Sequence, residues 1–255
     1  MTPACINEGG PASLVRLVAV PELDTEVTLQ AAAVEALRRW QARPGEIVTV
    51  VDPEQTCYRA RLTSLEADQG RAIPFEKSLR SLESRVSIEV YQALPEKERF
   101  ELILQKLTEI GVARVVPYVS RRSVTLEERD AGQRKSHRWP EVILRAARQC
   151  RRAMLPELYP VVSWDEATYL ASHAELKLML FEGDAPWTLK EALNGARPDR
   201  VALLVGPEGG FAPEEVEDAR QMGFLPVSVG PRILRTETAA IVGAALVQYA
   251  LGDLG

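Results

Sequence analysis

The chain has 255 residues, of which 46% are hydrophobic and 26% charged, and its formal net charge is −5. This composition is typical of a globular protein with a sizeable core, and the negative charge argues against indiscriminate binding to nucleic acid. The N-terminal residues MTPACINEGGPAS are polar, and no apolar run approaches the roughly 18 residues of a membrane span, so we expect neither a secretory leader nor a membrane helix.

The first part of the chain is predicted to form short strands and one helix. Apolar Ala33, Leu37 and Trp40 are spaced by four and three residues, which predicts a helix over residues 29–40. The breakers Pro44 and Gly45 end it. The expected strands are residues 14–20, 46–51, 58–65 and 71–74. This order predicts a small β-barrel with one helix, and the polar residues 78–84 are expected to form a linker.

The next segment predicts an α/β fold. The expected elements are a strand, a helix and a strand, at residues 86–93, 100–110 and 112–119. Leu102, Ile103, Leu107 and Ile110 form the apolar stripe of the helix, and Gly111 ends it. A strand–helix–strand order is typical of a parallel sheet.

Basic residues are concentrated between residues 112 and 152, where eleven of them face four acidic ones, so this segment is about +7 and the remainder about −12. A helix is predicted over residues 139–154, in which Arg145, Arg148 and Arg152 share a face. Such a face indicates either an anionic partner or a solvated charged surface neutralised by nearby glutamates.

The C-terminal part alternates strands and helices. Strands are predicted at residues 176–181, 201–205 and 225–229, and helices at residues 213–222 and 239–251. The second and third strands each lead into a glycine-containing loop, GPEGG and GPRILRTET. Neither loop fits the common nucleotide-binding motifs. Because ligands bind at the carboxyl ends of strands in open α/β sheets, we expect the two loops to form one binding site.

The sequences GPEGGFAPEEV and GPRILRTETA resemble the signature of the RsmE family of ribosomal RNA methyltransferases, of the SPOUT class. The resemblance implies a SPOUT α/β domain with a deep trefoil knot over residues 85–255 and a PUA-like RNA-binding β-barrel domain over residues 12–84. It also implies S-adenosylmethionine as the methyl donor, N3 of a uridine in 16S rRNA of the small ribosomal subunit as the target, a homodimer, and a cytoplasmic location.

The cofactor residues implied by the resemblance come from three loops. They are Phe181, Glu182, Leu204, Val205, Gly206, Pro207, Glu208, Gly209, Gly210, Val229, Gly230, Ile233, Leu234, Arg235, Thr236, Thr238 and Ala239. Glycines let the backbone approach an adenosyl group closely, and Leu204, Ile233 and Leu234 are expected to offer apolar surface to its ring.

N3 of uridine carries a proton at neutral pH, so the site must supply a base or stabilise the anion that forms. We expect Arg235 to stabilise the anion, Glu237 to accept the proton or to hold Arg235, and Glu208 to be a second carboxylate candidate. Alternatively, Arg235 and Glu237 form a structural pair at the start of the last helix, with Thr236 or Thr238 as its cap.

Expected RNA contacts are Arg121, Arg122, Arg145, Arg148 and Arg152. The chain departs from the family pattern at Arg148, where relatives typically carry glutamate, and in the N-terminal segment. A catalytically silent RNA-binding ribosome-assembly protein and a ribose 2′-O methyltransferase are the alternative functions.

Two further expectations concern the cysteines and the last helix. Cys5, Cys57 and Cys150 lack disulfide or zinc spacing, so we expect a reduced protein without a metal. The last helix, AAIVGAALVQYAL, is apolar on nearly every side, which indicates burial either in a dimer interface or within one subunit.

Overall fold

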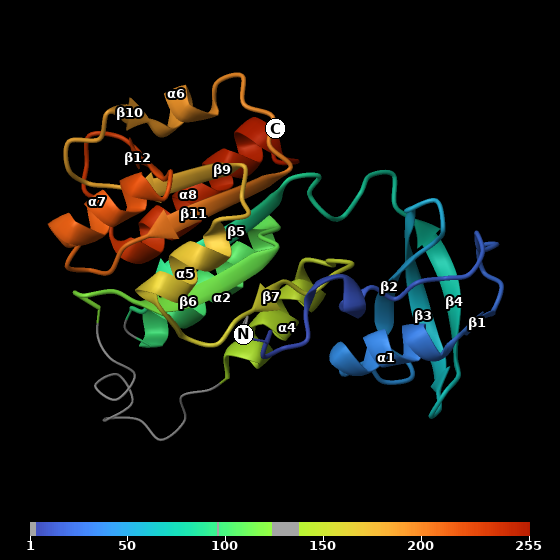
Figure 1. Cartoon of the computed structure of the whole chain (residues 1–255). Helices are drawn as coiled ribbons and strands as arrows, with labels where there is room; N and C mark the ends of the chain where they lie inside the picture. Colours follow the sequence, from blue (N-terminus) through green and yellow to red (C-terminus); the bar gives the residue numbers. More distant parts are fainter. Residues whose placement is uncertain (1–3, 96, 124–137) are drawn as a thin grey trace.

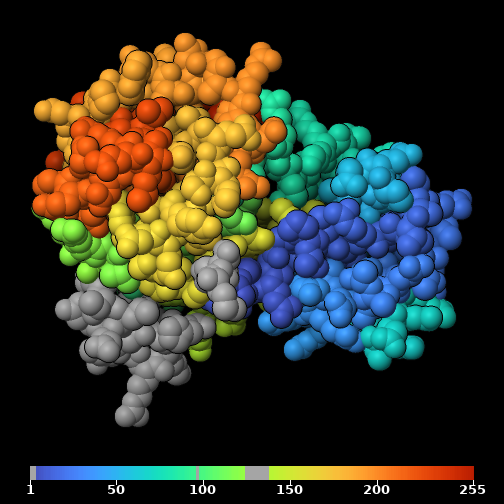
Figure 2. Space-filling model, in the orientation of Figure 1, coloured from blue at the N-terminus to red at the C-terminus, as the bar shows by residue number. Residues whose placement is uncertain are grey.

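The computed structural model describes residues 4–95, 97–123 and 138–255. The chain forms a small N-terminal lobe and a larger α/β lobe that lie side by side (Figure 1). The two lobes are in contact on the face drawn in Figure 2, where the N-terminal lobe is blue.

The small lobe contains a four-stranded antiparallel sheet in the order β1-β4-β3-β2. Its strands are β1 (Val27–Leu29), β2 (Ile47–Val51), β3 (Cys57–Leu65) and β4 (Gly70–Lys77). The helix α1 (Ala31–Arg39) packs its buried side chains, Leu37 among them, against one face of this sheet. The predicted helix and the last three predicted strands are therefore confirmed, with small shifts of their ends.

The predicted strand over residues 14–20 is wrong. A 3-10 turn (Gly10–Ser13) precedes it, and the segment contributes only an isolated bridge between Arg16 and Val51. The bridge is at Val51, where β2 ends, so no described strand lies beside the residues that follow. Val18 and Val20 are exposed. Within the described residues β1 and β2 are the two edges of an open sheet, so closure into a barrel stays a prediction.

The large lobe contains an eight-stranded sheet in the order β10-β12-β9-β11-β5-β6-β7, with β8 also paired to β6, and all of its pairs are parallel. The strands are β5 (Ser87–Ala93), β6 (Arg114–Val119), β7 (Glu157–Leu158), β8 (Val162–Ser163), β9 (Leu176–Leu180), β10 (Trp187–Thr188), β11 (Arg200–Val205) and β12 (Leu225–Ser228). The predicted parallel sheet is confirmed.

Helices cover both faces of this sheet, which explains why its central strands are continuous apolar runs. One face carries α2 (Lys97–Ile110), α6 (Leu189–Leu193) and α8 (Thr236–Leu251), with α4 (Trp139–Gln149) packed on α2. The other face carries α5 (Trp164–Ala171) and α7 (Pro213–Gln221). Successive residues of β5 alternate between these cores: Val90 packs on the α2 side and Tyr91 on the α5 side.

Two helix predictions need correction. Leu102 is exposed rather than part of the apolar stripe of α2, whose buried side chains are Phe100, Ile103, Leu104 and Leu107. The helix α4 ends at Gln149 and not at Met154, because the chain turns through Arg151 with φ +64°. Gly111 ends α2 with φ +92°, as predicted.

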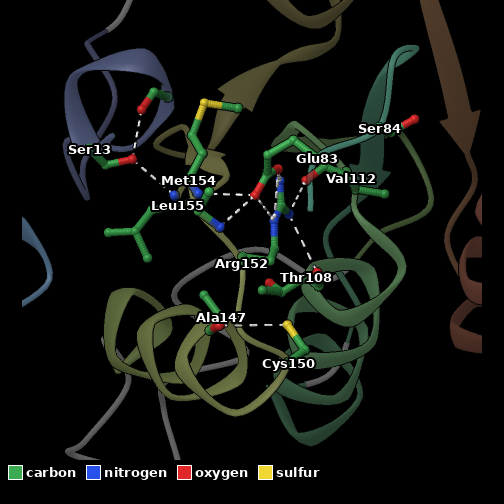
Figure 3. Close-up of polar contacts among 12 residues, drawn as sticks. Ser13, Glu83, Ser84, Thr108, Val112, Ala147, Cys150, Arg152, Met154 and Leu155 are labelled. Carbon is green, nitrogen blue, oxygen red and sulfur yellow. Dashed lines mark hydrogen bonds and ion pairs between the residues drawn. The ribbon is translucent and has the colours of Figure 1, made fainter. Parts of the chain in front are cut away.

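The segment of residues 78–84 joins the lobes without regular structure, as expected of a linker, but it is firmly attached. The carboxylate of Glu83 accepts hydrogen bonds from the guanidinium of Arg152 and from the amides of Ala153 and Met154 (Figure 3). Arg152 also donates to the carbonyl oxygens of Thr108 and Val112, so one buried side chain ties the linker to the end of α2.

Candidate functional site

The loops that follow β9, β11 and β12 lie at the carboxyl edge of the parallel sheet, where three neighbouring strands end. This is the edge at which open α/β sheets bind ligands. The first turn of α8 belongs to the same edge, because the loop after β12 leads directly into it.

The loop after β11 is a tight turn in which the amide of Gly210 donates to the carbonyl of Pro207 at 3.0 Å. Gly210 has φ +67°, and a Cβ there would lie 2.0 Å from Oε1 of Glu182. Any larger residue would therefore be strained and would displace this carboxylate. Glycine at this position lets the loops after β9 and β11 come together.

Thr236, the first residue of α8, links this helix to the ends of two strands. Its buried hydroxyl donates to the carbonyl of Gly206 at 2.6 Å and accepts from Nε2 of Gln92 at 3.0 Å. Gln92 is in β5 and Gly206 follows β11, so this hydroxyl fixes α8 against both strand ends. The helix starts three residues earlier than predicted because Arg235 takes the N-cap position, although its side chain makes no capping bond.

We expect Thr236→Val, which keeps the side-chain shape, to lower the free energy of unfolding by roughly 1–3 kcal/mol. The substitution leaves the partly buried carbonyl of Gly206 and the side-chain amide of Gln92 without this partner. Urea denaturation measures the effect, and Thr238→Val in the same turn, whose hydroxyl has no hydrogen bond among the described residues, should change stability by less than about 0.5 kcal/mol. Equal effects of the two changes would contradict this role.

Two arginine side chains from other segments contact the GPEGG loop. Arg99, at the start of α2, pairs with Glu208 at 2.9 Å, and Nη1 of Arg122 donates to the carbonyl of Gly209 at 3.1 Å. The buried carboxylate of Glu215 accepts from the amides of Ala212 and Arg121, which joins α7 to the loop after β6. Glu208 is thus already held by an arginine in this structure.

Two adjoining pockets open between these loops, with volumes of about 390 Å³ and 260 Å³. They share Leu180, Glu182, Ile233, Leu234 and Ala239. The larger pocket is further lined by Arg99, Val205, Gly206, Pro207, Glu208, Gly210, Arg235 and Thr236. The smaller one is further lined by Phe181, Gly183, Ser228, Val229, Gly230, Pro231 and Arg232. The structure therefore brings together most of the residues proposed for the cofactor.

Leu204, Gly209 and Thr238 do not line either pocket. Leu204 is fully buried on the face of β11 that packs against α5 and α7, whereas the pocket lies on the α8 side. The expectation that it offers a surface to a ligand ring is therefore corrected, and Leu180 of β9 lies at the pocket instead.

The two other proposed catalytic residues stand at the first turn of α8. Arg235 is exposed and lines the larger pocket, and its guanidinium makes no hydrogen bond or ion pair with any described residue. Oε2 of Glu237 is buried and has no hydrogen-bond partner among the described residues. Among the described residues Arg235 and Glu237 form no ion pair or hydrogen bond with each other. The alternative in which they form a structural pair at the start of the last helix is therefore wrong.

Sequence patterns missed Arg99, Leu180 and Gln92. Each lies at or just after the carboxyl end of a central strand or at the start of the following helix. Their places next to the ends of β5 and β9 could have indicated them. The sequence, however, does not reveal that these two strands are the neighbours of β11.

The proposed RNA-binding arginines fall into separate environments. Arg121 and Arg122 lie beside the pocket loops, Arg145 pairs with Glu141 on the exposed side of α4, and Arg148 contacts Glu46 and the carbonyl of Trp40 in the small lobe. Arg152 is only 5% exposed and is paired with Glu83. RNA contact by Arg152 is therefore wrong, because its donors are already used inside the protein.

The described residues contain no group of three His, Cys, Asp or Glu side chains arranged to hold a metal ion. In the same part of the chain, no helix combines the length and the apolar character needed to cross a membrane.

Comparison with known proteins gives a family match and a similar relative. A family model described as an RNA methyltransferase domain matches residues 82–248. The ribosomal RNA small subunit methyltransferase E of Buchnera aphidicola subsp. Schizaphis graminum is 32% identical over 185 residues, which cover 71% of this chain and 73% of that protein.

Two solved structures with bound S-adenosylmethionine are similar over nearly the whole chain. The ribosomal RNA small subunit methyltransferase E of Neisseria gonorrhoeae has a TM-score of 0.66 and 30% identity, covering 94% of this chain and 98% of that one. A putative methyltransferase of Legionella pneumophila has a TM-score of 0.66 and 31% identity, covering 94% and 99%.

Proposed function

The chain belongs to the RNA methyltransferase family that includes ribosomal RNA small subunit methyltransferase E, and on this premise we propose that it methylates N3 of a uridine in 16S rRNA with S-adenosylmethionine as donor. The observation that carries the proposal is the pair of pockets between the loops after β9, β11 and β12. They stand at the sheet edge where ligands bind, and similar proteins have been crystallised with that donor.

The residues present fit the donor. A pocket of about 390 Å³ lies within the range of roughly 300–1,000 Å³ typical of small-molecule sites. The glycines at 206 and 210 let the loop after β11 pack closely against Phe211 and Glu182, and Ile233 and Leu234 offer apolar surface to the pocket. The exposed carboxylate of Glu182 can accept hydrogen bonds from ribose hydroxyls.

When bound, S-adenosylmethionine supplies an electrophilic methyl group. The protein must remove the proton from N3 of the uridine and stabilise the negative charge that spreads over O2 and O4. Oε2 of Glu237 and the guanidinium of Arg235 have no partner among the described residues. We propose Glu237 as the proton acceptor and Arg235 as the anion stabiliser. Because Glu208 is paired with Arg99, we assign it to holding the loop and not to accepting the proton.

Family membership supports a finer architecture, which is part of the proposal. We assign residues 12–84 to a PUA-like RNA-binding domain with a closing barrel, and residues 85–255 to a SPOUT domain whose C-terminal chain forms a deep trefoil knot. The enzyme acts in the cytoplasm on the small ribosomal subunit, and Arg121 and Arg122 contact the RNA beside the pocket.

We further propose a homodimer through the outer face of α8. Its inner face, including Gly243 and Ala244, packs against β9, β11 and α2 of the same chain, where a Cβ at Gly243 would lie 2.7 Å from Leu180. Leu246 and Tyr249 are 40% and 68% exposed and three residues apart, so they share the outer face.

Introducing a charge on this face is expected to dissociate the dimer. Tyr249→Glu should weaken self-association at least about tenfold, because burying an unpaired carboxylate costs free energy. Analytical ultracentrifugation measures the change. Leu79→Glu, at the 98% exposed Leu79 of the linker, is the matched control and should leave the sedimentation coefficient unaltered. A monomeric wild-type protein would refute the dimer.

The biological test of the function uses rRNA from a strain that lacks the protein. A methyl group on N3 blocks the Watson–Crick face, so reverse transcriptase stops there, whereas a ribose methyl interferes far less. We expect one stop in 16S rRNA to disappear in the deletion strain and to return on complementation. If every stop persists, the chain is not this methyltransferase, and the silent assembly protein and the ribose 2′-O methyltransferase are the remaining functions.

A further inference from the structure

A second cavity, of about 410 Å³, lies where the small lobe meets the end of α4. Its floor is apolar and includes Val15, Trp40, Val48 and Ala147. Its polar lining is mainly arginine: Arg59 of β3 and Arg148, Arg151 and Arg152 from the end of α4 and the turn after it. We call this cavity the inter-lobe groove.

The charges in the inter-lobe groove are only partly neutralised. Arg152 is paired with Glu83, and Arg148 lies 3.6 Å from Glu46. Arg59 and Arg151 have no ion pair with a carboxylate in the described part of the chain, although Glu76 stands opposite Arg59 on β4. As far as the structure describes the chain, two arginines thus share the groove without a direct counter-ion.

These two arginines are held near one another by a single hydroxyl. Nη1 of Arg59 donates to Oγ1 of Thr49 at 2.9 Å, and the same hydroxyl contacts the carbonyl of Arg151 at 3.3 Å. Arg151 has φ +64°, a conformation that residues other than glycine rarely adopt. Burial first and the charge of Arg151 second lower the pKa of Arg59, which agrees with two cations in proximity. The fold therefore maintains an unfavourable arrangement of charge that an anion would relieve.

We propose that the inter-lobe groove binds a phosphodiester group of the substrate RNA through Arg59 and Arg151, with Arg148 at its rim. This inference rests on the proposed function, which supplies RNA as the partner. Guanidinium groups match phosphate oxygens in geometry as well as charge, and the apolar floor can accommodate the adjoining ribose.

The inter-lobe groove lies apart from the methyl-transfer pocket. In Figure 1 β2, which forms one wall, lies on the side of the large lobe opposite to α7 and the pocket loops. The groove shares no lining residue with the methyl-transfer pockets and is separate from them, so its phosphate is not that of the target uridine. Such a contact positions the RNA without reading its sequence.

The test measures binding of a 16S rRNA transcript by filter retention over a series of salt concentrations. For the double variant Arg59→Gln/Arg151→Gln we expect affinity at low salt to fall at least tenfold, and the slope of log K against log salt to fall by about 1 to 2. Arg59→Lys/Arg151→Lys retains both charges and should recover the slope. Arg220→Gln, which removes an exposed charge from α7, is the control and should keep the wild-type slope.

Further measurements separate this proposal from folding and from the proposed function. The melting temperature and the affinity for S-adenosylmethionine should match the wild type in the double variant. Unchanged RNA affinity and salt slope would overturn the groove as an RNA site, even if methylation is normal. Stabilisation of the wild type, but not of the double variant, by inorganic phosphate without any change in RNA binding would also overturn it, as a site for small anions only. A loss of RNA affinity in a protein that proves inactive in methylation would support the groove while refuting the enzyme.

Discussion

Replacing Arg235 with alanine is expected to lower the rate of methyl transfer by about 10²–10³-fold, the usual effect of removing one group that stabilises a developing anion. Arg235 reaches the larger pocket from the N-cap of α8, and its guanidinium is not engaged by any described residue. It is therefore available to the uracil oxygens that become negative as N3 loses its proton.

The affinity for S-adenosylmethionine should remain close to the wild-type value in Arg235→Ala, because the backbone of the loops and the hydroxyl of Thr236 stay in place. Calorimetric titration of the donor and single-turnover methylation of rRNA separate the two effects. Arg220→Ala, far along α7, is the control for a lost positive charge. Unchanged turnover in Arg235→Ala would refute its assigned role.

The second large effect concerns stability. We expect Arg152→Met to lower the free energy of unfolding by roughly 3–5 kcal/mol, because it leaves the carboxylate of Glu83 without its partner at the junction of the lobes. The amides of Ala153 and Met154 still donate to Glu83, which places the effect toward the lower end of that range (Figure 3). Two carbonyl oxygens, of Thr108 and Val112, also lose a donor.

Urea denaturation measures this change. Arg145→Met removes an exposed ion pair with Glu141 on the same helix and should cost less than about 1 kcal/mol. Adding Glu83→Gln to Arg152→Met removes the unpaired charge and should restore part of the lost stability. Equal effects of the two single arginine changes would contradict the structural role of Arg152.

The sequence predicted the parallel sheet well because its central strands are apolar runs bounded by turns. The helix α7 was also well placed, since Pro213 opens it and Gly223, with φ +83°, follows its end. The strands β7, β8 and β10 were not predicted, because two residues are too few to show any periodicity.

The candidate site was predicted in outline but not in detail. The loop residues were found from their glycines and charges, whereas Leu204 was misplaced because the alternation of a strand does not reveal which face a given helix will cover. Arg145, Arg148 and Arg152 were grouped by helical spacing. The helix ends before Arg152, so this residue turns into the protein and the group separates.

The inter-lobe groove could not be predicted at all. It joins β2 and β3 to the turn after α4, segments about a hundred residues apart in the chain, and the one bond that links Thr49 to Arg151 spans them. Only the packing of the two lobes brings Arg59 and Arg151 together.

The central claim is that the loops after β9, β11 and β12 form the site from which a methyl group is transferred to N3 of a uridine. The most direct measurement incubates the purified protein with methyl-labelled S-adenosylmethionine and small ribosomal subunits from a deletion strain, followed by nucleoside analysis of the 16S rRNA. We predict one equivalent of labelled N3-methyluridine per subunit. Label in a ribose 2′-O-methyl nucleoside, or no label despite bound donor, would contradict the account.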